Sequence, residues 1–249
     1  KIKRIKKPKK FKNKFSGEIL KELPFKLTKS QNTVLSEINE DLKSKTRMFR
    51  IIQGDVGSGK TIVSFLAAAN VIESGWQCAL MAPTEILAKQ HFDLACKLFL
   101  NTNFRIDFLT GKTEISKRKK VIENLENGKI DFIIGTHSLF QKKINFSNLG
   151  LSIIDEQHKF GVKQRKKLSD KGGNDCDVLL MTATPIPRTL TMTMYGDMDL
   201  SIIKEKPKLR KPIKTYSKLE SKINDIIKFI KKEIKFGNQI FWVCPLIEE

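Results

Sequence analysis

A glycine-rich run that ends in lysine and threonine forms a pattern that can hold phosphate. The segment Gly54–Thr61 reads G-D-V-G-S-G-K-T. Backbone N–H groups of such a loop can surround phosphate oxygens, and a helix that starts there adds partial positive charge. Lys60 supplies a mobile cation, and Thr61 offers a hydroxyl to Mg²⁺. The residues predicted to bind a nucleotide are Gly54, Gly57, Ser58, Gly59, Lys60 and Thr61.

An acidic pair further along the chain extends phosphate binding to a prediction of hydrolysis. Asp155 and Glu156 follow the apolar run 151–154, so they are expected at the end of a strand. One carboxylate can hold Mg²⁺, directly or through water, and its neighbour can polarise the attacking water. We assign Asp155 to Mg²⁺ and Glu156 as the catalytic base, and the alternative is an exposed acidic turn. His158 can report the phosphate state to the rest of the site, although a single histidine is more often structural.

These residues need elements that bring them together, and the hydropathy pattern predicts such elements. The apolar segment 48–52 is expected to be a strand before the glycine loop, and residues 62–69 continue as a helix. Further strands are predicted at 77–81, 104–109, 131–134, 151–154 and 177–181, with helices at 86–100 and 115–125. This alternation indicates an α/β fold with a mostly parallel sheet and helices on both faces. Ligands of such sheets gather at the carboxyl ends of strands, where the loop and Asp155 both fall.

The two ends of the chain have a different organisation. Residues 1–22 are expected to be a basic linker from a missing upstream domain. Nine basic residues lie within 1–14, and the alternative is that this run forms a DNA-contacting arm. Thr28 can cap a helix with apolar positions between 34 and 42. The predicted nucleotide-binding domain covers 23–206, and the proline-bracketed stretch 207–212 is predicted to be a linker. Residues 213–249, with a helix at 223–234 and a strand at 239–243, are expected to begin a second domain that this chain does not complete.

The composition limits the class of protein. The 249 residues carry a net charge of +20, and 40% of them are hydrophobic. No run approaches the roughly 18 apolar residues of a membrane span, and no secretory signal is present, so a cytoplasmic protein without a membrane partner is expected. The charge fits a nucleic-acid partner, but the lysine excess also fits an AT-rich coding sequence, so both interpretations stay open. The widely spaced cysteines predict buried free thiols rather than a disulfide or zinc site.

Several segments together resemble the DExH group of superfamily 2 helicases and translocases. The resemblance starts from Gly54–Thr61 and Asp155–His158. Four further segments fit the same pattern in the same order: Leu27–Gln31 resembles the adenine-recognising glutamine motif, Ala82–Ala88 motif Ia, Gly135–His137 motif Ib, and Thr182–Thr189 motif III. The resemblance implies a RecA-like domain of the P-loop NTPase class, followed by the incomplete start of a second RecA-like domain.

The resemblance also implies roles for the matched residues. It implies that Gln31 reads the adenine of ATP, while Lys60, Thr61, Asp155 and Glu156 serve phosphate, Mg²⁺ and hydrolysis. Coupling of hydrolysis to movement is implied for Thr182 and Thr184, in addition to His158. Positions near the DNA backbone are implied for Pro83, Thr84, Glu85, Thr136 and His137. For these last two segments, a strand end and a simple turn are the alternatives.

Longer segments narrow the resemblance to the RecG family, bacterial translocases that remodel branched DNA. They are Leu23–Thr28, Asp155–Val162, Met181–Arg188, Tyr195–Asp199 and Phe241–Glu249. The Mfd family, which displaces stalled RNA polymerase, shares two of these elements, but Gln157 and 195–199 favour RecG. The implied activity is ATP-dependent helicase action on replication forks and Holliday junctions in recombination and repair. The implied partners are branched double-stranded DNA, an upstream wedge domain and a second motor domain.

Another interpretation belongs to a different class of protein. The chain would be a truncated, nearly inert fragment that binds ATP and DNA, and its early end motivates this interpretation. The resemblance also implies that the family's arginine finger lies in the second motor domain, past Glu249. An arginine finger is worth about a thousandfold or more in rate, so this chain alone is expected to hydrolyse ATP poorly.

Overall fold

The computed structural model describes residues 5–141, 143–156, 171–184, 198–205 and 214–244. The chain divides into two compact units, Lys1–Lys208 and Leu209–Glu249. Among the described residues, no helix combines the length and the apolar character that a membrane crossing needs.

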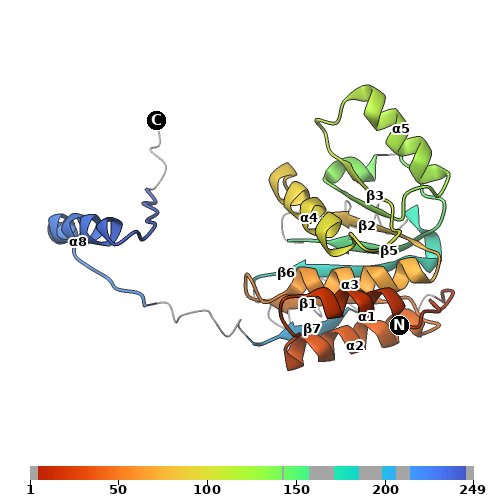
Figure 1. Cartoon of the computed structure of the whole chain (residues 1–249), viewed down its shortest axis with the longest axis horizontal. Helices are drawn as coiled ribbons and strands as arrows, with labels where there is room; N and C mark the ends of the chain where they lie inside the picture. Colours follow the sequence, from red (N-terminus) through yellow and green to blue (C-terminus); the bar gives the residue numbers. More distant parts are fainter. Residues whose placement is uncertain (1–4, 142, 157–170, 185–197, 206–213, 245–249) are drawn as a thin grey trace. The chain divides into compact units, whose positions relative to one another are not determined.

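A parallel sheet forms the centre of the larger unit (Figure 1). Within the described residues it has seven strands, in the order β3-β4-β2-β5-β6-β1-β7. Their bounds are β1 Phe49–Gly54, β2 Gln77–Met81, β3 Ile106–Leu109, β4 Phe132–Gly135, β5 Leu149–Ile154, β6 Asp177–Thr182 and β7 Asp199–Ile203. Each neighbouring pair is parallel. The predicted α/β fold with a parallel sheet is confirmed.

Helices cover both faces of this sheet. One face carries α1 Lys14–Glu22, α2 Lys29–Lys43, α3 Lys60–Glu73 and α4 Glu85–Leu98, and the other carries α5 Ile115–Glu126. Successive strand residues point to opposite faces, so Ile52 joins the first apolar cluster and Ile51 the second. Both faces are therefore dry, which explains why β2, β4, β5 and β6 are buried along their whole length.

The helix α2 starts as the sequence predicts. Thr28 is its N-cap, and its hydroxyl accepts a hydrogen bond from the Gln31 backbone N–H. The Gln31 side-chain oxygen in turn accepts a bond from the Thr28 backbone N–H at 2.8 Å, which completes a capping box. This reciprocal pair fixes the start of α2, and it also fixes the Gln31 side chain beside the phosphate loop.

The amino-terminal segment differs from the expected linker or DNA-contacting arm. Lys6 and Lys9 are buried, and their ammonium groups lie 2.6 and 2.9 Å from the same carboxylate oxygen of Asp177. Burial lowers the pKa of Lys6, and the Asp177 charge partly offsets that effect. We call Lys6, Lys9 and Asp177 the lysine clamp. After it, α1 packs against α3 (Figure 1). The charge pattern of the sequence does not predict these ion pairs, because Asp177 lies about 170 residues away from the lysines.

The cysteines and the smaller unit also depart from expectation. Cys78 and Cys176 are buried free thiols, whereas Cys96 and Cys244 are exposed. In the smaller unit, α8 Ile223–Lys235 forms the predicted helix. The strand predicted at 239–243 is not formed, because a strand needs a paired neighbour and these residues are exposed without one in the described part of the chain. The predicted linker 207–212 lies outside the described residues.

Candidate functional site

The predicted hydrolysis residues meet at the carboxyl ends of three adjacent strands. The phosphate loop follows β1, Asp155 follows β5, and Thr182 ends β6, which lies between them. Parallel pairing places these three ends at one edge of the sheet. Residues far apart in the sequence thereby form one site.

The phosphate loop uses glycine where a side chain would not fit. Gly57 and Gly59 have φ of 79° and 89°, in the left-handed region that favours glycine. A Cβ on Gly59 would lie 2.3 Å from the Gln31 side-chain nitrogen, and one on Gly54 would lie 2.6 Å from the Ser58 hydroxyl. The positive φ values therefore favour glycine at 57 and 59, and a side chain at 54 or 59 would displace Ser58 or Gln31.

Gln31 contacts the loop directly. Its side-chain nitrogen donates a 2.8 Å hydrogen bond to the Ser58 carbonyl. The side chain is thus held at both ends, by the capping box and by the loop. Its implied role of reading adenine stays a prediction, but its position beside the loop suits such a role.

Lys60 lies across the loop that it follows. Its ammonium donates hydrogen bonds of 2.6 Å to the Gly54 carbonyl and 3.0 Å to the Asp55 carbonyl. The residue is buried, and burial lowers the pKa of Lys60, while the charges of Asp155, Glu156 and Asp55 act in the opposite direction. A cation held between carbonyls at this edge can be redirected toward phosphate oxygens without leaving the site.

The acidic pair at the end of β5 is held in a defined conformation. Asp155 is 8% exposed, and its Oδ2 lies 2.8 Å from Nε2 of His91. Its Oδ1 accepts a 3.0 Å hydrogen bond from the Glu156 backbone N–H. Glu156 itself has φ of 48°, an uncommon value for a residue with a side chain. Such backbone strain at a candidate catalytic base is typical of functional sites.

Sequence reasoning missed His91. It lies on α4, between Ala88 and Ala95 on the buried face of that helix. This spacing shows that the histidine points toward the core, but it does not identify a partner 64 residues away. The small alanines on either side allow α4 to approach the sheet closely.

The described part of motif III lies at the end of β6. The hydroxyls of Thr182 and Thr184 are 2.9 Å apart, and the Thr184 backbone N–H donates to the Thr182 hydroxyl. Thr182 is buried, whereas Thr184 is exposed. His158 and residues 185–189 lie outside the described residues, so their predicted roles stay predictions.

The predicted DNA-facing residues follow β2 and β4, nearer the other side of the sheet. Thr84 is exposed, and its hydroxyl caps α4 by accepting from the Leu87 N–H at 3.2 Å. Pro83 is partly exposed. Thr136 is buried, with its hydroxyl 3.0 Å from that of Ser138, so of the motif Ib pair His137 is the exposed member. The structure thus assigns Thr136 to the loop's internal bonding rather than to its surface.

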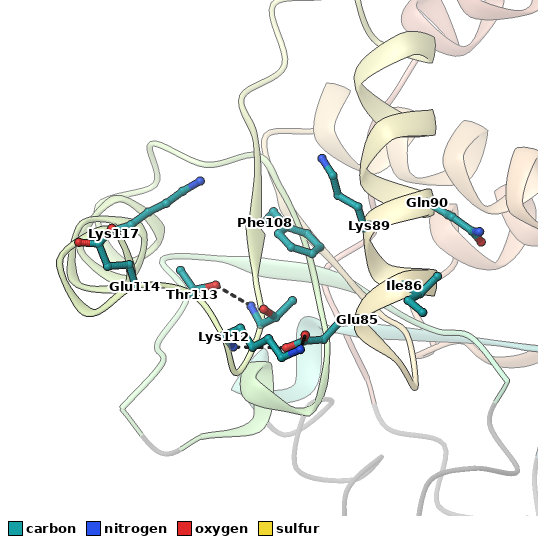
Figure 2. Close-up of a pocket in the computed structure, with 10 residues that line it drawn as sticks. Glu85, Ile86, Lys89, Gln90, Phe108, Lys112, Thr113, Glu114 and Lys117 are labelled. Carbon is teal, nitrogen blue, oxygen red and sulfur yellow. Dashed lines mark hydrogen bonds and ion pairs between the residues drawn. The ribbon is translucent and has the colours of Figure 1, made fainter.

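A hollow of about 580 Å³ lies beside these residues (Figure 2). Its walls come from the start of α4, from β3 and from the segment that leads into α5. Glu85 faces this hollow, where its carboxylate lies 3.4 Å from the Lys112 ammonium. Three lysines from different elements line it: Lys89, Lys112 and Lys117. A surface with these lysines can attract polyanions.

The chemistry of the donor set fits a magnesium nucleotide. Mg²⁺ is usually held by one or two carboxylates together with substrate phosphates, and here one carboxylate and the Thr61 hydroxyl belong to the same edge. The Ser58 hydroxyl is buried without a hydrogen-bond partner in the described part of the chain. Such an unsatisfied polar atom at a phosphate loop is consistent with a site shaped for an additional polar group.

Comparison with known proteins gives consistent matches. The family model described as DEAD/DEAH box helicase matches residues 28–193. The "ATP-dependent DNA helicase RecG" of Bacillus subtilis is 50% identical over 239 residues, which cover 96% of this chain and 35% of that relative. The RecG of Thermotoga maritima is 46% identical over 242 residues, with 97% and 31% covered.

A solved structure, "Structure of RecG bound to three-way DNA junction", matches with a TM-score of 0.86 and 42% identity. The match covers 98% of this chain and 33% of that one. The expected RecA-like fold and the resemblance to RecG are therefore confirmed. The chain spans about a third of the length of the relatives that it matches.

Proposed function

Because the chain belongs to the DEAD/DEAH box helicase family, we propose that it is the first motor domain of an ATP-driven translocase that remodels branched DNA. The observation that carries the proposal is the meeting of Lys60 with Asp155 and Glu156 at one sheet edge. The RecG relatives support the choice of branched DNA, and one of them was solved on a three-way junction. We propose that residues 213–249, within the smaller unit Leu209–Glu249, begin the second motor domain.

Each residue of the site has a distinct task in ATP hydrolysis. Lys60 supplies positive charge where negative charge develops on the transferred phosphoryl group. Asp155 and Thr61 would hold Mg²⁺. When bound, that ion neutralises phosphate charge. Glu156 orients and polarises the attacking water, and the backbone of the glycine loop binds phosphate oxygens. Thr182 and Thr184, at the end of β6, couple ATP hydrolysis to movement along DNA.

The proposal is tested by ATP turnover of the full-length protein with and without three-way junction DNA. We expect the junction to stimulate turnover more than linear duplex does. Glu156→Gln should lower the stimulated rate by about a hundredfold, since it removes the base but keeps the shape. The same variant should still bind ATP. Equal turnover with and without DNA, or unchanged turnover in Glu156→Gln, would contradict the proposal.

A second prediction concerns the hollow beside α4. Replacing Lys89 and Lys117 together by alanine should weaken DNA binding about tenfold at low salt, and by a similar factor for different sequences. The slope of log affinity against log salt concentration should fall by about 0.9 for each lost phosphate contact. Fluorescence anisotropy with labelled junction DNA measures both quantities.

The matched control replaces two exposed lysines at the opposite edge of the sheet. Lys97 is in the last turn of α4, and Lys129 lies just before β4. The control removes the same amount of charge. Comparison of the two double variants therefore distinguishes a local contact with DNA from a general effect of charge. Equal loss of affinity in both variants would show that this hollow does not bind DNA.

A further inference from the structure

We propose that His91 is a positioning residue for Asp155 and that it carries the effect of DNA from the start of α4 to the hydrolysis site. The second part rests on the function proposed above. His91 matches none of the motifs found in the sequence, and it contacts the carboxylate on which that function depends.

The first step of the argument is the fixed geometry of the carboxylate. His91 Nε2 lies 2.8 Å from Asp155 Oδ2, and both residues are 8% exposed. The Glu156 N–H binds the other oxygen at 3.0 Å. A buried carboxylate with one partner on each oxygen has a single preferred orientation. Removal of the histidine would free one oxygen to turn away from the ion that Asp155 is proposed to hold.

The second step is the fixed position of the histidine itself. Its ring packs edge-on against Phe65 of α3, with ring centroids 6.3 Å apart and planes at 68°. Phe65 is 1% exposed, so this contact belongs to the core. α3 begins at Lys60 directly after the phosphate loop. The imidazole therefore lies between the helix of the phosphate loop and the acidic pair, where rotation of the ring is restricted.

The third step is the course of α4. The helix begins at Glu85, next to Thr84, and His91 is six residues further along, which corresponds to about 9 Å of helix. Two of the proposed DNA-facing residues, the N-cap Thr84 and the first helical residue Glu85, are thus joined to His91 by one helix. The hydrogen bond between His91 and Asp155 links this element to the acidic pair. A small displacement of the exposed start of α4 would therefore move the imidazole relative to Asp155.

A matched pair of substitutions distinguishes this role from simple packing. The variant His91→Gln keeps a nitrogen donor at the end of the side chain, whereas His91→Leu fills similar space without one. In this chain we expect His91→Leu to raise the Mg²⁺ concentration needed for half-maximal binding of a fluorescent ATP analogue by about tenfold or more. His91→Gln should stay within about threefold of the wild type.

The same pair in the full-length protein tests the link to DNA. His91→Leu should lower junction-stimulated ATP turnover by about tenfold or more and DNA-free turnover much less, and His91→Gln should restore most of the stimulation. Junction affinity should not change. If both variants lose stimulation to the same extent, the histidine acts through packing and the coupling part of the inference is wrong.

The two proposals fail in different ways. A wild-type protein without DNA stimulation would overturn the proposed function together with the coupling part of this inference. The Mg²⁺ dependence of analogue binding would still decide whether His91 positions Asp155, since that measurement needs neither DNA nor turnover. Normal stimulation in His91→Leu, beside a stimulated wild type, would overturn the coupling alone.

Discussion

Lys60→Ala is expected to lower DNA-stimulated ATP turnover of the full-length protein by about a thousandfold. The Lys60 ammonium is the cation held at the carboxyl end of β1, among three acidic residues that favour its charged form. Alanine removes that charge from both the bound phosphates and the transition state. Binding of a fluorescent ATP analogue should therefore weaken as well, in contrast to Glu156→Gln.

DNA binding provides the internal control for this variant. Lys60 lies at the β1 end of the sheet edge, away from the strands that carry Thr84 and His137. Junction affinity of Lys60→Ala should thus stay within about twofold of the wild type, and Lys129→Ala should leave turnover unchanged. Turnover of Lys60→Ala within about tenfold of the wild type would show that the phosphate loop does not drive this protein.

Asp177→Ala is expected to cause the largest loss of stability, about 3–5 kcal/mol in the free energy of unfolding. The Asp177 carboxylate is fully buried. It accepts a 2.7 Å hydrogen bond from the Met48 backbone N–H and forms ion pairs with Lys6 and Lys9. Alanine would leave two buried ammonium groups without their counter-charge. Urea unfolding of the chain, followed by circular dichroism, measures the difference.

Two further variants identify the cause of that loss. Asp175→Ala, a neighbouring change that removes the acceptor of the Lys7 backbone N–H, should cost about 1 kcal/mol or less. Replacing Lys6 and Lys9 by methionine in the Asp177→Ala background should recover part of the stability, because the unpaired charges are then gone. If the methionine substitutions lower the free energy of unfolding further, the unpaired charges of Lys6 and Lys9 are not the cause of the loss.

Much of the fold follows from local patterns in the sequence. The strands β2 and β6 each contain four consecutive apolar residues, and α2 carries its own cap signal at Thr28. β7 was not predicted because its buried positions alternate at the sheet edge and its apolar run is short. α1 was not predicted because it has few apolar residues and contains Gly17, and its burial depends on packing against α3.

The candidate site shows a similar division. Lys60 and Asp155 belong to motifs whose spacing suggests their chemistry, so the sequence is enough to propose roles for both. The role of His91 does not follow from the sequence, since its partner is fixed by the approach of α4 to β5 and not by any sequence interval. The lysine clamp was missed for the same reason. In the sequence, the basic run 1–14 is indistinguishable from a solvated segment, because its buried partner Asp177 is brought near only by the fold.

The strand order has a consequence for engineering. The proposed nucleotide residues follow β1 and β5, and the proposed DNA residues follow β2 and β4, with the hollow at β3. β1 and β3 are five positions apart, which corresponds to about 24 Å along the edge at about 4.8 Å per strand. The proposed DNA and nucleotide residues thus occupy two adjoining stretches of one edge, which meet where β2 pairs with β5. Exchange of the loops after β2, β3 and β4 should therefore change which DNA the domain binds. The proposed ATP site should stay intact, provided that His91 keeps its contact with Asp155.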